Sequence, residues 1–186
     1  GIGWNYLGWL SDLANDTGMD SADIAVSIAD NFMSACLEDN PNDYLSQSVM
    51  NLAALPAFRD QLETYAAYLS DALSNGQLPT ISRSRQRMYS DQVDFTAFLD
   101  ATRQFAPNMA SQLEKSYQDC IYYCIGTDMF DYLTGMSVML PGDTTLDFLD
   151  NFAAYDCGEQ YPNFSQFTYG YATLLAGGNY TFTLQK

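Results

Sequence analysis

The sequence predicts an α/β fold that is mostly helical with a few strands, and two kinds of apolar spacing carry this prediction. Apolar residues recur at helical spacing over Ile24 to Cys36 and over Phe58 to Leu73. Gly135 to Leu140 instead alternates Met136, Val138 and Leu140 with Ser137 and Met139, and Pro141-Gly142 follows it, as is typical of a strand. The helical segments outnumber the strand segments, so we expect helices to dominate the fold.

Runs of apolar residues at helical period mark the expected helices, and several also have a cap or proline at the start or a stop at Gly, Pro or Asn. The expected helices are Trp4 to Leu13, the segment between the cap at Asp20 or Ser21 and the break at Asn40, Pro56 to Ser74, Phe95 to Thr102, Pro107 to Cys124, a segment around Leu146 to Phe152, and Ser165 to Ala176. The expected strands are Leu45 to Met50, Gly135 to Leu140 and Tyr180 to Leu184. Ile81 to Tyr89 fits either type.

The few strands bear on the domain organisation. Isolated strands leave backbone groups unsatisfied, so these must pair over long separations or with strands that lie outside this chain. The opening Gly1 to Leu10 is rich in aromatic residues, whereas free termini are more often small and polar. No internal boundary is evident, so we expect residues 1–186 to be a single domain or the C-terminal fragment of a larger one.

The charge limits the partners of this chain. It has 186 residues with 23 acidic and 7 basic side chains, a net charge of −16. Such a field repels the phosphate backbone of nucleic acids and anionic lipid surfaces. No run of eighteen apolar residues is present to span a membrane. We therefore expect neither a nucleic-acid partner nor a membrane partner.

The chain has no histidine, which excludes a Ser-His-Asp triad, a Cys-His dyad and a histidine-bearing zinc site built from these residues alone. Of its four cysteines, Cys120 and Cys124 are one helical turn apart on an apolar face, so we expect buried thiols without a metal. A disulfide that involves Cys36 or Cys157 stays open. We expect no cofactor and no metal.

Three other groups have two interpretations each. Arg83, Arg85 and Arg87 would form an anion or docking patch, or a surface segment that pairs with nearby acids. The aromatic residues of the opening segment would line a pocket or pack a helix onto the core. Four aspartates near the best strand would bind calcium, although no EF-hand spacing supports this; they are Asp128, Asp131, Asp143 and Asp147.

The order of segments resembles the C-terminal half of the clostripain-like (C11 family) cysteine peptidases over roughly residues 3 to 155. The segments that carry the resemblance are Gly3-Trp4-Asn5-Tyr6 with Trp9-Leu10, the capped helix around Ile24 to Cys36, Leu45 to Leu52 with its long helix, Ser90 to Phe95, and Gly135 to Pro141. The resemblance implies a caspase-like α/β sandwich, secretion by a bacterium to the medium or the cell surface, and cleavage of peptides after basic residues.

In that family the catalytic histidine and cysteine precede the Gly-Trp-Asn-Tyr segment, so the resemblance assigns no catalytic residue to this chain. It implies a non-catalytic portion that supports a catalytic half and is inactive alone. The partners would be that half and, through it, a peptide substrate, and Gly3, Trp4 and Tyr6 would lie nearest the substrate. The alternative is an acidic, mainly helical interaction module without enzymatic activity.

Overall fold

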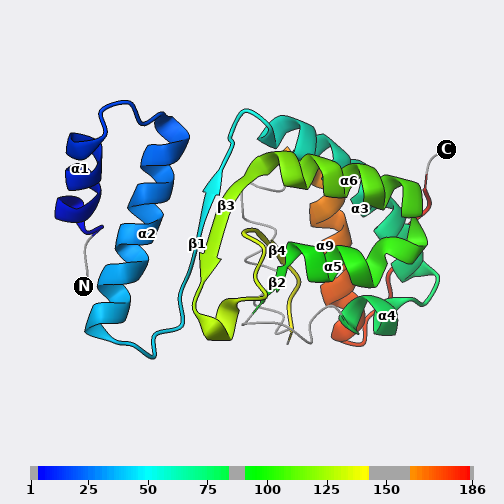
Figure 1. Ribbon diagram of the computed structural model, residues 1–186. Coiled ribbons are helices and arrows are strands. Elements are labelled where there is room, and N and C mark those ends of the chain that lie inside the picture. The colour runs from blue at the N-terminus through cyan, green and yellow to red at the C-terminus, as the bar shows by residue number, and fades with distance from the viewer. Residues whose placement is uncertain (1–3, 84–90, 143–159, 185–186) are drawn as a thin grey trace. The chain divides into compact units, whose positions relative to one another are not determined.

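The computed structural model describes residues 4–83, 91–142 and 160–184, which form a mixed α/β, mostly helical structure with two small antiparallel sheets (Figure 1). The chain divides into two compact units. Unit 1 comprises Gly1–Leu52 and Asp119–Met136, and unit 2 comprises Ala53–Gln118 and Ser137–Lys186. Within the described ranges, no helix combines the length and the apolar character needed to cross a membrane.

Unit 1 begins with two helices, as the sequence predicts. These are α1 (Tyr6–Asn15) and α2 (Ser21–Asp39). Asp20 caps α2 by accepting hydrogen bonds from the backbone N–H groups of Ala22 and Asp23, and the Asp23 carboxylate accepts from the Asp20 N–H in return. This reciprocal capping box satisfies donors that the first turn of a helix leaves unpaired, and it fixes the start of α2.

The sheet of unit 1 joins segments that lie far apart in the sequence. Strand β1 (Ser46–Met50) pairs antiparallel with β3 (Ile121–Gly126), and the register shifts between Val49 and Met50. Helix α2 packs against both strands, and α1 packs against α2. The predicted strand at Leu45 to Met50 is thereby confirmed.

The predicted helix from Pro107 to Cys124 is wrong in its last turn. Helix α6 is Pro107–Cys120, and β3 starts at the next residue. Cys124 is therefore a strand residue, although its spacing from Cys120 matches a helical turn. The run Ile121-Tyr122-Tyr123 contains β-branched and aromatic residues that suit a strand, and hydrogen bonds to β1 outweigh the helical period.

Unit 2 holds most of the buried apolar side chains. Its elements are α3 (Leu55–Ser74), α4 (Leu78–Ser82), β2 (Gln92–Asp94), α5 (Phe95–Thr102), the 3-10 turn η2 (Arg103–Phe105), α6 as far as Gln118, β4 (Ser137–Met139) and α9 (Pro162–Leu175). Helices α3 and α9 pack on each other. The largest fully buried side chains include Tyr65, Phe95, Phe98, Phe167 and Tyr171.

Strand β4 confirms a strand within Gly135 to Leu140, and its described neighbour is β2. Three residues of β2 are too short to show an alternating pattern in the sequence. The predicted strand at Tyr180 to Leu184 is wrong, since that segment has no strand assignment. Its Phe182 N–H instead donates to the Ser74 hydroxyl of α3. The predicted helix around Leu146 to Phe152 lies outside the described residues.

Candidate functional site

Helix α1 presents its polar side to α2. The Asp12 carboxylate accepts hydrogen bonds of 2.7 Å from the Ser27 hydroxyl and of 2.7 Å from the Asn31 side-chain amide. The Asn5 amide donates to the Asn31 carbonyl at 3.2 Å. Any side chain at Gly8 would collide with Asn31, so glycine allows the close approach of the two helices. The hydrogen bonds from Ser27 and Asn31 lower the pKa of Asp12, and the bond from Ser27 is the largest cause.

The opposite side of α1 is apolar and faces solvent. Leu7 is 87% exposed, Tyr6 60% and Leu10 46%, and no residue of α1 is buried. Residues three and four positions apart share a helix face, so these three side chains form one surface. Trp4, 48% exposed, precedes the helix and contacts Phe32 in a tilted arrangement with ring centroids 5.1 Å apart. We call Trp4, Tyr6, Leu7 and Leu10 the outer surface of α1.

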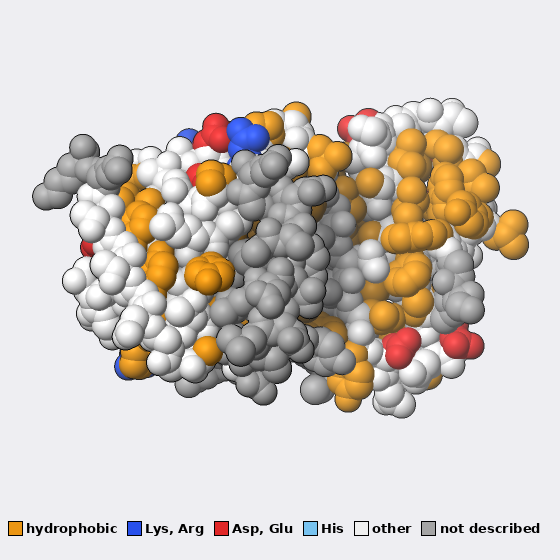
Figure 2. All heavy atoms as spheres, turned by 180° about the vertical axis from the view of Figure 1, so that it is seen from behind, with side chains coloured by type: hydrophobic (Ala, Val, Ile, Leu, Met, Phe, Trp, Pro, Cys, Tyr) orange, Lys and Arg blue, Asp and Glu red, His pale blue; other side chains and the backbone are white. Residues whose placement is uncertain are grey.

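Figure 2 shows, on the side of unit 1 that it presents, hydrophobic side chains gathered over helices α1 and α2. Only four of the buried apolar side chains in the described residues belong to unit 1; they are Ala29, Met33, Cys36 and Cys120. Unit 1 therefore leaves much of its apolar surface outside its own small core. Contiguous apolar surface of this kind marks an interaction site in a folded protein.

Charge is distributed unequally between the two units. Every Lys and Arg of the chain lies in the segments of unit 2, and unit 1 has none. The acidic residues of unit 1 are Asp12, Asp16, Asp20, Asp23, Asp30, Glu38, Asp39, Asp43, Asp119, Asp128 and Asp131. Uncompensated charge of one sign produces a field that attracts cations and cationic proteins. Unit 1 thus combines an exposed apolar surface with a negative field.

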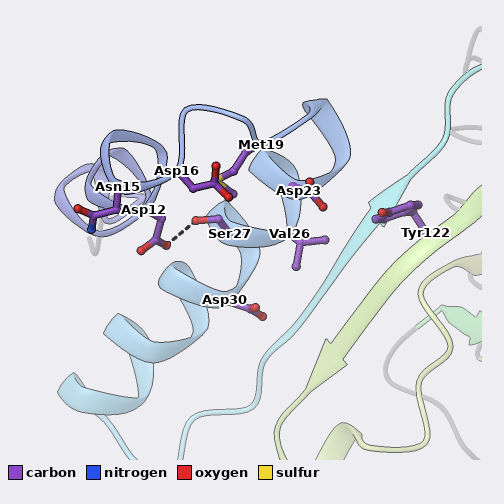
Figure 3. A pocket seen from close by; sticks show the side chains of 9 residues that line it. All are labelled: Asp12, Asn15, Asp16, Met19, Asp23, Val26, Ser27, Asp30 and Tyr122. Carbon is purple, nitrogen blue, oxygen red and sulfur yellow. Dashed lines mark hydrogen bonds between the residues drawn. The ribbon is translucent and has the colours of Figure 1, made fainter.

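An open pocket of about 640 Å³ lies in unit 1, lined by Asp12, Asn15, Asp16, Met19, Asp23, Val26, Ser27, Asp30 and Tyr122 (Figure 3). Its carboxylates are spread along its length, and the described residues contain no group of three or more His, Cys, Asp or Glu side chains placed to hold a metal ion. Asp30 accepts a 2.5 Å hydrogen bond from the Tyr123 hydroxyl, which raises the pKa of Tyr123 to about 12.

The structure places two of the three predicted substrate-side residues on the outer surface of α1. Trp4 and Tyr6 belong to it, and Gly3 lies outside the described residues. Leu7 and Leu10 complete this surface, although no sequence motif singled them out. The signal that could have found them is the polar pair Asn5 and Asp12, which flanks Gly8 on one side of the helix and leaves leucines on the other.

The structure describes only some of the cysteines, arginines and aspartates singled out in the sequence. Cys36 and Cys120 are buried, and burial raises the pKa of both thiols. Cys124 is only half-buried, so the prediction that both Cys120 and Cys124 are buried is wrong for Cys124; its thiol donates a weak hydrogen bond to the Leu133 carbonyl at 3.5 Å. Arg83 is exposed. Arg85, Arg87, Asp143, Asp147 and Cys157 lie outside the described residues.

No protein-family model, no curated protein and no solved structure matches this chain. The class that the fold and the site define is therefore an α/β, mostly helical protein in which an acidic unit exposes the apolar side of a helix.

Proposed function

We propose that the chain is an acidic, mainly helical interaction module and that the outer surface of α1 docks a protein partner. The orientation of α1 carries this proposal: its polar side chains bind α2, while Tyr6, Leu7 and Leu10 face solvent. A surface helix ordinarily buries its apolar stripe. In α1 only Gly8, Trp9 and Leu13 are half-buried, and the other apolar residues are exposed.

The energy available at this surface is substantial. Full burial of a leucine side chain stabilises a complex by about 1.5–3 kcal/mol, and aromatic side chains contribute on a similar scale. Leu7 and Leu10 are the most apolar members of the surface, and Trp4 and Tyr6 add the residue types that dominate binding at many interfaces. Burial of these side chains by a partner would offset part of the entropy lost on association.

A peptide library selected on the full chain tests this proposal. The comparison variant is Leu7→Ser with Leu10→Ser, which should fold normally because both side chains are exposed. The matched control is Leu52→Ser, another exposed leucine of unit 1 that lies outside α1. We expect the selected peptides to lose tenfold or more in affinity for the double variant and to bind the control as they bind the original chain. Selected peptides that bind all three proteins equally would refute the docking role.

A second proposal identifies that partner as part of the same protein. The chain would be the non-catalytic C-terminal portion of a secreted clostripain-like cysteine peptidase with a caspase-like sandwich, and the outer surface of α1 would contact the catalytic half. The position of Trp4 and Tyr6 on the exposed surface favours it, because the resemblance assigns these residues to the side nearest the substrate.

The peptidase proposal makes a direct prediction for this chain. Without a histidine to activate a thiolate, and with buried Cys36 and Cys120 thiols whose pKa values are raised, the 186-residue protein should not cleave Arg- or Lys-containing peptides. The measurement is turnover of a fluorogenic Arg-peptide. Cysteine-dependent turnover would sink this idea, and so would a gene in which no histidine and cysteine pair is encoded upstream of Gly1.

A further inference from the structure

We infer that the occupant of the outer surface of α1 is a cationic amphipathic helix of a protein partner, with apolar residues on one side and Lys or Arg at its margins. This inference rests on the docking role proposed above and adds the chemistry of the partner. Two observations carry it: the apolar side chains that face solvent, and the complete lack of Lys and Arg in unit 1.

Carboxylates lie near the end of α2 that is next to the start of α1. The Asn5–Asn31 and Asp12–Ser27 hydrogen bonds show that α1 and α2 run antiparallel. Asn31 lies opposite the first half of α1, since it also bonds Asp12 and lies against Gly8. Beyond Asn31, α2 continues to Asp39, which at 1.5 Å per residue is about 12 Å. Glu38 and Asp39 are exposed in this last turn. Acidic residues therefore lie past the start of α1.

Acidic residues also lie at the other end of α1. Asp16 directly follows the helix, and Asp20 caps α2 after a short turn; both are exposed. Exposed carboxylates thus lie beyond both ends of α1, and their field reaches the outer surface most strongly at low salt, because the Debye length is only about 8 Å at physiological ionic strength. No basic side chain of unit 1 reduces their field. A helix with apolar residues at its centre and cations at its margins complements this pattern.

The same charges argue against two other occupants. A second copy of the chain would bring another unit of the same sign and with no basic residue against this surface, so like charges would oppose self-association. Helices that lie on membranes carry Lys or Arg on their polar side and bind anionic headgroups. The polar side of α1 instead carries Asp12 and is bonded to α2. A basic protein segment fits the surface better than either.

The test uses the full chain and three labelled 18-residue peptides in fluorescence anisotropy. All three have Leu and Trp at i, i+3, i+4 and i+7 spacing, and their remaining positions are Lys, Gln or Glu. We expect the Lys peptide to bind at least tenfold tighter than the Gln peptide, to lose at least fivefold between 50 and 300 mM salt, and to depend on Leu7 and Leu10. The Glu peptide should not bind.

Two sets of isosteric substitutions separate local charge from total charge. The first set neutralises four carboxylates at the two ends of α1 while keeping hydrogen-bond acceptors: Asp16→Asn, Asp20→Asn, Glu38→Gln and Asp39→Asn. The matched control neutralises four carboxylates of unit 2: Asp60→Asn, Asp71→Asn, Asp100→Asn and Glu114→Gln. We expect the first set to weaken the Lys peptide at least fivefold without affecting the Gln peptide, and the control set to have a smaller effect.

The outcomes distinguish the two proposals. Equal binding of the Lys and Gln peptides, lost in the Leu7→Ser, Leu10→Ser variant, keeps the docking role and overturns the cationic partner. Binding of the Lys peptide that ignores those two substitutions, or no binding of any peptide, overturns both. Leucine-dependent dimerisation in sedimentation, or leucine-dependent binding to phosphatidylcholine vesicles, keeps the surface but replaces the partner inferred here.

Discussion

Glu63 offers the sharpest test of how unit 2 is stabilised. This residue lies on α3, and its carboxylate accepts hydrogen bonds from the backbone N–H groups of Asn163 at 2.7 Å and Phe164 at 3.0 Å. Both donors belong to the first turn of α9, whose N-cap residue Tyr161 makes no side-chain cap. A half-buried side chain from another helix therefore does the work of the cap and places a negative charge at the positive end of the helix dipole.

The magnitude follows from these two bonds. Loss of an N-cap costs about 0.5–2 kcal/mol, and a carboxylate at a helix N-terminus contributes about 0.3–1 kcal/mol more. Glu63→Ala should therefore destabilise unit 2 by about 2 kcal/mol, which corresponds to a Tm roughly 5–10 °C lower for a unit of this size. Glu63→Gln keeps one acceptor oxygen and loses the charge, so about 1 kcal/mol is expected. The bond from the Asn163 side-chain amide to the Glu63 backbone carbonyl survives both changes.

The assay is urea denaturation followed by circular dichroism, combined with hydrogen exchange of the amides of Asn163 and Phe164. The control is Asp60→Ala on the same helix, where the carboxylate pairs at the surface with Arg59 and its loss should cost less than about 0.5 kcal/mol. Exchange at the first turn of α9 should accelerate in the Glu63 variants and stay unchanged in the control. A Glu63→Ala variant within about 0.5 kcal/mol of the original chain would refute the capping role.

Three further predictions concern buried groups. The pKa values of Tyr65 and Tyr123 are raised from 10 to about 12, by burial for Tyr65 and chiefly by the hydrogen bond to Asp30 for Tyr123. Their contribution to folding is complete below pH 10 and is lost as the pH rises from 10 to about 12, because the unfolded state releases these protons first. Gly170→Ala should destabilise unit 2 by about 1–3 kcal/mol, because the new methyl group would collide with the ring of Tyr180. Cys120 should react with a thiol reagent only on unfolding, since its side chain is buried and its thiol pKa is raised.

Each of the three has its own readout. Absorbance at 295 nm should show a late fraction of the tyrosine ionisation that includes Tyr65 and Tyr123, and a single transition near pH 10 would contradict the first. A thermal denaturation of Gly170→Ala that matches the original chain would count against the second, with Gly76→Ala as a variant at an open but positive-φ turn for comparison. Fast labelling of Cys120 in the folded chain, located by mass spectrometry, would contradict the third.

The helices could be predicted from the sequence because their signals are local. The Asp20 capping box, the proline in the first turn of α3 and the apolar spacing of Phe58, Leu62, Tyr65 and Leu69 act over at most a few turns. Each of these signals works within the segment that carries it, so it can be interpreted without knowing what the segment contacts. The same holds for β4, where the alternation and the following Pro141-Gly142 identify a strand.

Strand partners and strand limits could not be predicted in this way, since they depend on contacts between distant residues. Met50 pairs with Ile121 and Val93 with Val138, and no local pattern specifies which segment meets which. The end of α6 at Cys120 belongs to the same category. Its helical period continues to Cys124, but pairing with β1 satisfies the backbone of Ile121 to Gly126 in a ladder instead.

The outer surface of α1 could also be predicted only in part from the sequence. The amino-acid order alone establishes that residues 1–52 contain no basic side chain and that Trp4, Tyr6, Leu7 and Leu10 are clustered near one end of the chain. It does not establish which side of α1 faces outward, because an amphipathic period predicts a covered apolar stripe and only the tertiary contacts show where that expectation fails. The hydrogen bonds from Ser27 and Asn31 to Asp12, together with the close approach at Gly8, orient the polar side toward α2. Leu7 and Leu10 are exposed for that reason, so the tertiary contacts of α2 decide which side of this amphipathic helix faces solvent.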